Sequence, residues 1–372
     1  MQIENNILKT DEKIAFLLRS LYHRFGYNHY KMKKFEEYEL YARNRDFLSS
    51  ESIISFTDTT GKLMALKPDV TLSIINNSQD DKNQIKKLYY DENVYRLNKG
   101  FSSYSEIRQI GLECIGYLSI YEICEVVGLA LKSLENITEY YIFEISHIGL
   151  LNSIFEENKI QDGIKNKILN CIRSKSIDEF DMICKNEQID ENIINKLKVF
   201  MKNFRSIDEA ISELRNICST EISKKEMDEF NEVLNFIKQM GYNENSKVNF
   251  ALTNDINYYS GVAFKGYVMG IPSGIISGGQ YDNLMEKMGR TSNAIGFAVY
   301  LNELKRLGSS KSEYDVDILL LHGGYMAEAV NEVKILSKYG KSVWVSDFIP
   351  KNIKYRKLLK MTDKGVIEYE SN

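Results

Sequence analysis

The chain has 372 residues, of which 43% are hydrophobic and 27% charged, and its net charge is -4. This composition is typical of a globular protein of two or three domains and excludes wholesale disorder, and the near-neutral charge disfavours a dedicated nucleic-acid binder. No apolar run approaches the roughly 18–20 residues that span a membrane, and residues 1–13 are too polar to predict a signal peptide. Five scattered cysteines without a C-x-x-C pair, together with four histidines, predict a cytoplasmic protein that has free thiols and needs no metal or cofactor.

Hydrophobic periodicity predicts alternating helices and strands before residue 150. Helices are expected at about 11–25, 68–77 and 119–134, and strands at 53–57, 63–66, 88–97, 106–117 and 140–146.

The amino-acid composition changes after residue 149. Glycine nearly vanishes until about 240, and charged residues alternate with Ile, Leu and Phe at helical spacing, which predicts a helical insertion at about 149–245. Beyond it we expect strands at 247–253 and 258–268, a glycine-rich entry at 270–279, helical segments at 280–289 and 294–307, and a strand–helix–strand piece at 316–321, 325–339 and 342–346.

The strand around 106–115 carries the most informative polar pattern. Gln109, Gly111 and Glu113 share one face because side chains alternate along a strand. An amide and a carboxylate on either side of a glycine form a notch whose acceptors suit an ammonium group. The alternative is an ordinary solvent-facing sheet surface.

Three further features are each open to two interpretations. The glycines at 270–279 suit either an anion at a helix entry or close backbone packing. Tyr258 and Tyr259 suit either a site or the core, and Arg96 suits either a bound anion or an ion pair.

Four stretches, in this order, resemble histidyl-tRNA synthetases, which are class II enzymes. Residues 56–71 contain LKPDVT, which resembles the L-R-P-[ED]-x-T core, and 94–96 with 106–113 resemble class II motif 2. Residues 257–264 (NYYSGVAF) resemble L-D-Y-Y-T-G-x-x-F, and GGQYD at 278–282 with AIGFA at 294–298 resembles G-G-R-Y-D and motif 3. The resemblance implies an α+β fold, a class II aminoacyl-tRNA synthetase-like core with an antiparallel sheet flanked by helices, over about 1–310.

Departures from the synthetase pattern fall on the positions that serve ATP. The motif 3 arginine aligns with Glu303, the G-G-R-Y-D arginine with Gln280, the R-G-L-D-Y-Y arginine with Asn254 and the motif 2 glutamate with Asn98. Adenylation needs positive charge on the developing phosphate. The resemblance therefore implies that no catalytic residues remain.

The positions that hold the amino acid are retained by the same alignment. They are Asp69, Thr71, Gln109, Glu113 and Tyr259. A retained pocket beside a dismantled adenylation site resembles the regulatory subunits of ATP phosphoribosyltransferase, the synthetase paralogues of histidine biosynthesis. This resemblance implies a non-catalytic dimer that joins a short-form catalytic subunit, with histidine as a candidate ligand. The alternative is a divergent histidine–tRNA ligase or a related amino-acid-activating enzyme.

The C-terminal residues 311–372 are too few for a complete anticodon-binding domain of the family. Nine Lys and Arg against nine Asp and Glu follow residue 312, a balance that is poorly suited to tRNA phosphates. We expect a truncated remnant that binds no tRNA.

Overall fold

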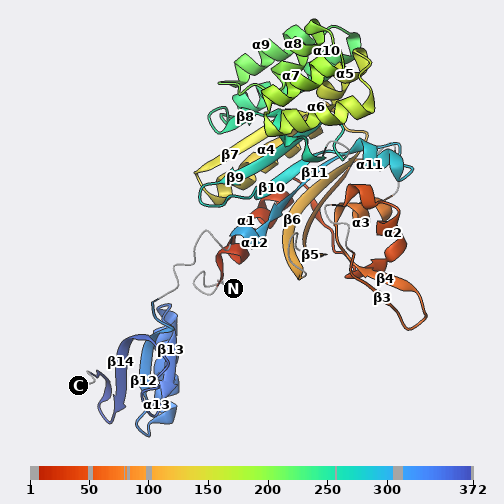
Figure 1. The fold of residues 1–372 in the computed structure, drawn as a ribbon. Coiled ribbons are helices and arrows are strands. Elements are labelled where there is room, and N and C mark those ends of the chain that lie inside the picture. The colour runs from red at the N-terminus through yellow and green to blue at the C-terminus, as the bar shows by residue number, and fades with distance from the viewer. Residues whose placement is uncertain are drawn as a thin grey trace. The chain divides into compact units, whose positions relative to one another are not determined.

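The computed structural model describes residues 8–48, 53–78, 80–81, 84–97, 103–255, 258–304 and 313–369. The chain divides into two compact units: Ile14–Leu304, and a smaller one that holds residues 313–369 (Figure 1).

The larger unit is built on a sheet of eight described strands in the order β1-β5-β6-β11-β10-β9-β7-β8. Neighbours run antiparallel except at the two edges, where β1 pairs with β5 and β7 with β8 in parallel. The strands are β1 (Asn28–His29), β5 (Lys86–Leu97), β6 (Tyr104–Gly116), β7 (Tyr141–His147), β8 (Ser246–Val248), β9 (Val262–Val268), β10 (Ile276–Gln280) and β11 (Asn293–Tyr300). This arrangement confirms the fold predicted from the sequence.

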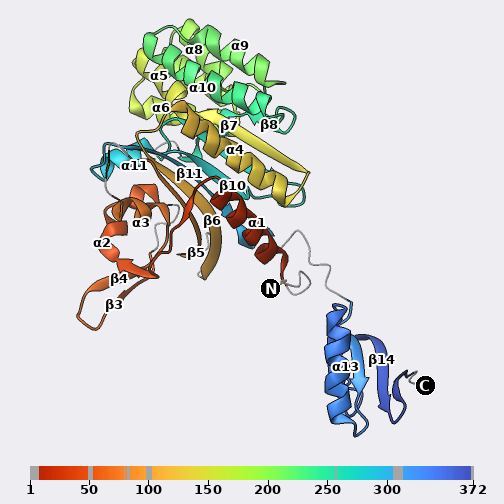
Figure 2. The same cartoon turned by 180° about the vertical axis from the view of Figure 1, so that it is seen from behind.

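Two helices cover one face of this sheet, α1 (Thr10–Arg24) and α4 (Ile120–Ile137) (Figures 1 and 2). Ser119 and Glu122 form a capping box that starts α4. The two helices meet where the hydroxyls of Tyr22 and Ser133 hydrogen-bond at 3.0 Å in a buried position. The Tyr22 ring also packs edge-on against Phe297 of β11.

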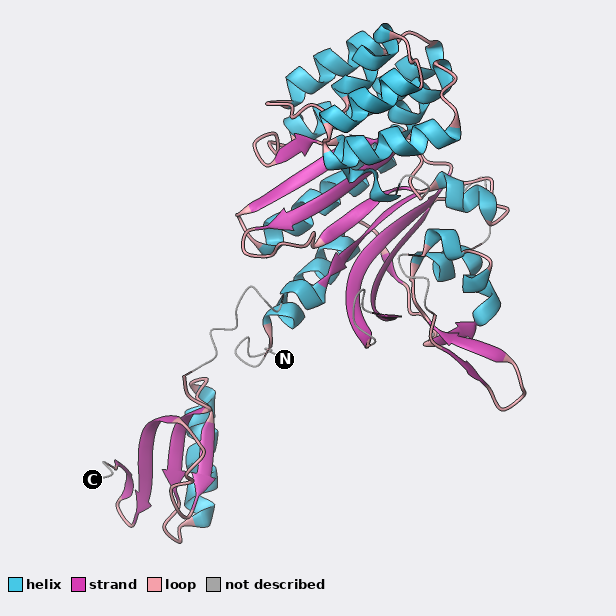
Figure 3. Ribbon diagram, viewed as in Figure 1, coloured by secondary structure: helices cyan, strands magenta, loops and turns pink. Residues whose placement is uncertain are grey.

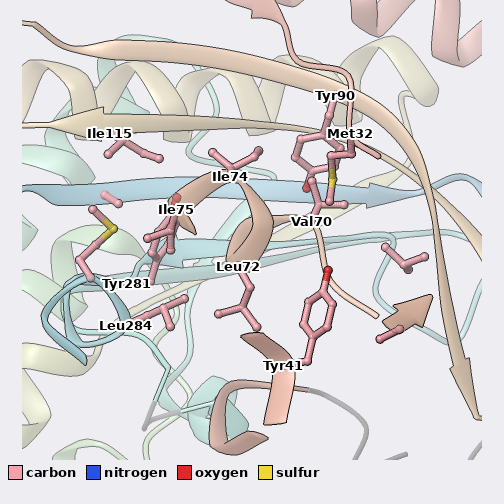
Figure 4. Close-up of a cluster of buried hydrophobic side chains, with 14 residues drawn as sticks. Met32, Tyr41, Val70, Leu72, Ile74, Ile75, Tyr90, Ile115, Tyr281 and Leu284 are labelled. Atoms are coloured by element: carbon pink, nitrogen blue, oxygen red, sulfur yellow. The ribbon is translucent and has the colours of Figure 1, made fainter. Parts of the chain in front are cut away.

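The opposite face holds short elements. They are α2 (Tyr38–Ala42), η1 (Arg45–Phe47), α3 (Thr71–Asn76), α11 (Asp282–Lys287) and a small sheet of β2 (Phe35–Glu37), β4 (Leu63–Leu66) and β3 (Ser55–Thr57). Five of the six α3 residues are buried. Their apolar members gather with side chains of α2, β5 and α11 in one cluster (Figure 4), which holds the β4–α3 turn against the sheet.

The predicted helical insertion lies between β7 and β8 and forms a bundle (Figure 3). Its helices are α5 (Ile148–Glu157), α6 (Asp162–Ser174), α7 (Ile177–Asn186), α8 (Glu191–Val199), α9 (Ile207–Ile217) and α10 (Glu221–Gln239).

The smaller unit is a sheet ordered β13-β12-β14-β15 with one helix. Its elements are β12 (Val316–Leu321), α13 (Met326–Lys338), β13 (Val343–Ser346), β14 (Tyr355–Thr362) and β15 (Gly365–Glu368). Trp344 on β13, the only tryptophan of the chain, is 44% exposed.

Four expectations about local structure were wrong. Residues 294–307 were expected to be helical, but β11 occupies the first half of that stretch, and among the described residues only the short helix α12 (Leu301–Leu304) follows. The glycine-rich entry contains the strand β10, and the strand expected at 247–253 gives way to the 3-10 turn η2 (Phe250–Asp255). No further strand was expected after the strand–helix–strand piece, but β14 and β15 follow it. Pairing with neighbouring strands, which local sequence does not reveal, decides these segments.

Candidate functional site

All five predicted pocket residues line one cavity of about 200 Å³ in the larger unit. Asp69 and Thr71 come from the start of α3, Gln109 and Glu113 from β6, and Tyr259 from the segment before β9. Gln109 and Glu113 are only 3% and 2% exposed. The interpretation of this strand face as a solvent-facing surface is therefore wrong.

Gly111 has a different role from the one expected of it. A Cβ at this position would lie 2.2 Å from the carbonyl oxygen of Phe297 and 2.5 Å from the hydroxyl of Tyr90. The chain itself makes the close approach that the glycine permits. The absence of a side chain at Gly111 thus leaves room for Tyr90, its partner across the two strands, whose side chain lines the cavity.

Glu113 is hydrogen-bonded to two hydroxyl groups within the cavity. Thr71 donates to Oε1 at 2.8 Å and Tyr281 donates to Oε2 at 2.6 Å. Burial is the main cause that raises the pKa of Glu113 to about 8, and the two hydrogen bonds oppose that rise. The carboxyl is therefore far less acidic than an exposed glutamate.

Asp69 and Arg96 form the charged side of the cavity. Arg96 Nη2 lies 3.6 Å from Asp69 Oδ2, and Arg96 Nε donates to the carbonyl oxygen of Pro68 at 2.7 Å. Burial raises the pKa of Asp69, while Arg96 and the backbone N–H of Leu72 act in the opposite direction. Arg96 is thus held as an ion pair, which is the second of the two interpretations of this residue.

Several tyrosines complete the lining. Burial raises the pKa values of Tyr90, Tyr258 and Tyr281 well above their ordinary range, so these hydroxyls stay neutral. Sequence reasoning missed Tyr90, for which no signal was available, and Tyr281, although Tyr281 stands within the GGQYD stretch. The described lining offers carboxyl, amide and hydroxyl acceptors to a small polar ligand.

Gln280 and Glu303, the two described positions that align with synthetase cations, do not line this cavity. The Gln280 side chain turns to the backbone, where its Oε1 accepts from the N–H of Val262 at 2.5 Å. Glu303 on α12 accepts from the hydroxyl of Ser273 at 2.8 Å. Asn98 lies outside the described residues, and so does the side chain of Asn254.

The glycines of β10 serve packing. A Cβ on Gly278 would lie 2.4 Å from the Cβ of Phe297, and one on Gly279 would lie 2.5 Å from the Val262 carbonyl oxygen. β10 is hydrogen-bonded on both sides, to β9 and β11. These contacts support the second interpretation, close backbone packing, for Gly278 and Gly279.

Among the described residues, no helix combines the length and apolar character needed to cross a bilayer. The same residues contain no group of three or more His, Cys, Asp and Glu placed to hold a metal ion.

Comparison with known proteins places these features in a family. The family model described as histidyl-tRNA synthetase matches residues 6–304. The ATP phosphoribosyltransferase regulatory subunit of Clostridium acetobutylicum is 27% identical over 297 residues, which are 78% of this chain and 73% of the relative.

Two solved structures share the fold. A protein from Bacillus halodurans, described as an ATP phosphoribosyltransferase regulatory subunit/histidyl-tRNA synthetase, matches with a TM-score of 0.77 at 21% identity, covering 97% of this chain and 96% of that one. A chain of the ATP phosphoribosyl transferase (HisG:HisZ) complex from Thermotoga maritima matches with a TM-score of 0.61 at 20% identity, covering 78% of this chain and 97% of that one. The resemblance predicted from the motifs is confirmed, and the chain belongs to the histidyl-tRNA synthetase family.

Proposed function

We propose that this chain is a regulatory subunit of ATP phosphoribosyltransferase, and that it joins a short-form catalytic subunit and conveys feedback by histidine. Its curated relatives carry the name of that subunit, and a chain of similar fold occurs in the HisG:HisZ complex. The role belongs to the first step of histidine biosynthesis.

One observation carries the proposal: the acceptor-lined cavity is intact while the positions aligned with ATP-binding arginines hold neutral or negative side chains. Glu303 stands where the motif 3 cation is expected and is bonded to Ser273. Beside a phosphate at about 4 Å, a charge of either sign is worth roughly 4 kcal/mol at an effective dielectric constant near 20, before screening. Replacing the cation by a carboxylate therefore turns an attraction into a repulsion of similar size.

The experiment that tests the regulatory role is reconstitution. The purified chain is mixed with a short-form ATP phosphoribosyltransferase catalytic subunit, and mass and activity are measured. We expect a larger hetero-oligomer, a gain of phosphoribosyltransferase activity, and inhibition of that activity by histidine. An unchanged sedimentation profile together with unchanged activity would contradict the proposal.

Glu113→Gln tests whether the cavity is the histidine sensor. In the proposed pose the ammonium of histidine is held by Glu113 and Gln109, with Asp69 or Thr71 completing the acceptors. Losing a hydrogen bond to a charged group costs about 1.5–3 kcal/mol, or roughly 10- to 150-fold in affinity. Feedback inhibition should weaken by a similar factor, whereas Glu106→Gln on the same strand, outside this cavity, should leave it unchanged. Equal inhibition of wild type and Glu113→Gln by histidine would show that the histidine sensor lies at another site.

The second candidate is a divergent histidine–tRNA ligase, which the family model favours. Histidine-dependent exchange of pyrophosphate with ATP separates the two functions. We expect no turnover, and none from Glu303→Arg either, because Gln280 and Asn254 remain neutral. Turnover in a preparation free of contaminating synthetase would establish the ligase.

We also propose that the chain forms a dimer through the region around Tyr27 to Leu40, which the resemblance aligns with class II motif 1, and that residues 311–372 are an anticodon-binding-domain-like segment without a tRNA partner. A stable interface needs at least about 1,000 Å² of complementary surface. Sedimentation should show a dimer at micromolar concentration, and a monomer would contradict this assembly. Titration with tRNA should show no binding.

A further inference from the structure

Glu113 lies in surroundings that favour its neutral form. It is 2% exposed, and the two hydrogen bonds that the structure gives its carboxyl come from neutral hydroxyls, those of Thr71 and Tyr281. Among the described lining residues, the one cation is Arg96, and it is paired with Asp69. A buried carboxylate without a cation beside it is costly, and such a group commonly keeps its proton.

The neighbours of Glu113 on every side support this state. The titratable groups that face it are Asp69 before α3, Tyr90 on β5, Tyr258 before β9 and Tyr281 before α11. Asp69 is the acid among them, and it raises the pKa of Glu113 further. The three tyrosines remain neutral. β11 contributes Gly296, where a Cβ would lie 1.8 Å from Glu113 Oε2, so the carboxyl is tightly enclosed.

The hydroxyl partners satisfy both protonation states of Glu113. A hydroxyl can donate or accept, so the neutral carboxyl can donate its proton to Thr71 Oγ1 while Tyr281 continues to donate to the other oxygen. The ionised carboxylate accepts from both hydroxyls. No hydrogen bond is therefore lost when the proton leaves.

We propose that this cavity takes up an ammonium-bearing ligand in exchange for the proton of Glu113. The ligand's N–H⁺ groups bond to the carboxylate as it forms, the carboxyl proton passes to the buffer, and the total charge is conserved. The identity of the ligand as histidine rests on the proposed function. Feedback in the assembled enzyme then depends on pH as well as on histidine concentration.

The size of the effect follows from the fraction of Glu113 that is ionised before binding. With a pKa of about 8, roughly a tenth is ionised at pH 7 and half at pH 8. The affinity for histidine should therefore rise about fivefold between these two pH values, and binding at pH 7 should release close to one proton for each ligand.

The first test is calorimetric titration of histidine at pH 7 in buffers with different ionisation enthalpies, which counts the protons released. We expect nearly one for the wild type and for Glu106→Gln, and none for Glu113→Gln, which binds more weakly. Binding to the wild type that releases no proton and does not change between pH 7 and pH 8 would overturn the exchange but leave the proposed function standing.

A second measurement needs no ligand. Carbon-13 NMR of labelled glutamate carboxyls follows Glu113 in the free protein, and the resonance is assigned by its absence from Glu113→Gln. We expect a titration near pH 8. Titration in the ordinary glutamate range would overturn the inference, whereas a titration near pH 8 without any binding of histidine would instead count against the proposed ligand.

Discussion

Replacing Glu113 by glutamine should stabilise the protein at pH 8 and change it little at pH 5. The pKa of the carboxyl is 4.5 as a model value and about 8 in the folded protein, chiefly because of burial. Between these values the folded state holds a proton that the unfolded state has released. The stability of the wild type therefore falls as the pH rises from about 4.5 toward 8, and glutamine, which does not titrate, abolishes that fall.

The magnitude follows from the size of the pKa shift. Each unit corresponds to about 1.36 kcal/mol, so the wild type should lose roughly 3 kcal/mol at this site between pH 5 and pH 8. Glutamine has nearly the same shape, and its amide can hydrogen-bond to the hydroxyls of Thr71 and Tyr281. We therefore expect the variant to be more stable than the wild type by about 2–4 kcal/mol at pH 8.

Urea denaturation followed by far-ultraviolet circular dichroism at both pH values measures this difference. Groups that titrate in both proteins cancel when the two curves are subtracted. Glu106→Gln, an exposed change on the same strand, should follow the wild type. A variant that is less stable than the wild type at pH 8, or equally displaced at both pH values, would refute the reasoning.

Three further substitutions test the packing around the site. Lys67 is 1% exposed and pairs with Glu92, so Lys67→Met should lower the free energy of unfolding by about 3–5 kcal/mol. Adding Glu92→Gln should recover much of that loss, because no unpaired buried charge then remains. Strictly additive losses in urea denaturation would contradict the pair. Gly261→Ala places a Cβ 2.2 Å from Gln280 Oε1 and should cost about 1–3 kcal/mol, a loss that Gln280→Ala should reduce in thermal denaturation of the double variant. Ser119→Ala removes the N-cap of α4 and should cost about 1 kcal/mol; unchanged hydrogen exchange in the first turn of α4 would show that the cap is dispensable.

The sequence predicted those parts of the fold that are marked by local periodicity or by a motif. Alternation along β6 placed Gln109 and Glu113 on one face, and helical periodicity marked the insertion. β10 and β11 were assigned wrongly because Gly278, Gly279 and Ala294 carry little strand propensity. Pairing on both sides holds these strands in the middle of the sheet. β14 was hidden because lysines and an arginine interrupt its apolar residues.

For the candidate site, too, the sequence predicted some features and not others. The aligned motifs located Asp69, Thr71, Gln109, Glu113 and Tyr259, and the structure brings all five to one cavity. The sequence could not show that Tyr281 donates to Glu113, since the two residues are 168 positions apart. Nor could it show that the acceptors are enclosed, because burial depends on every element that packs around β6.

The position of Trp344 gives the small C-terminal unit a fluorescence signal of its own. The chain has no other tryptophan, and this indole is 44% exposed on β13. Excitation at the red edge of protein absorbance therefore produces fluorescence from the unit of residues 313–369 alone, because the 24 tyrosines do not absorb there. Quenching by iodide or acrylamide then reports whether a partner, an effector or a change of pH reaches this unit, without any label and without altering a residue.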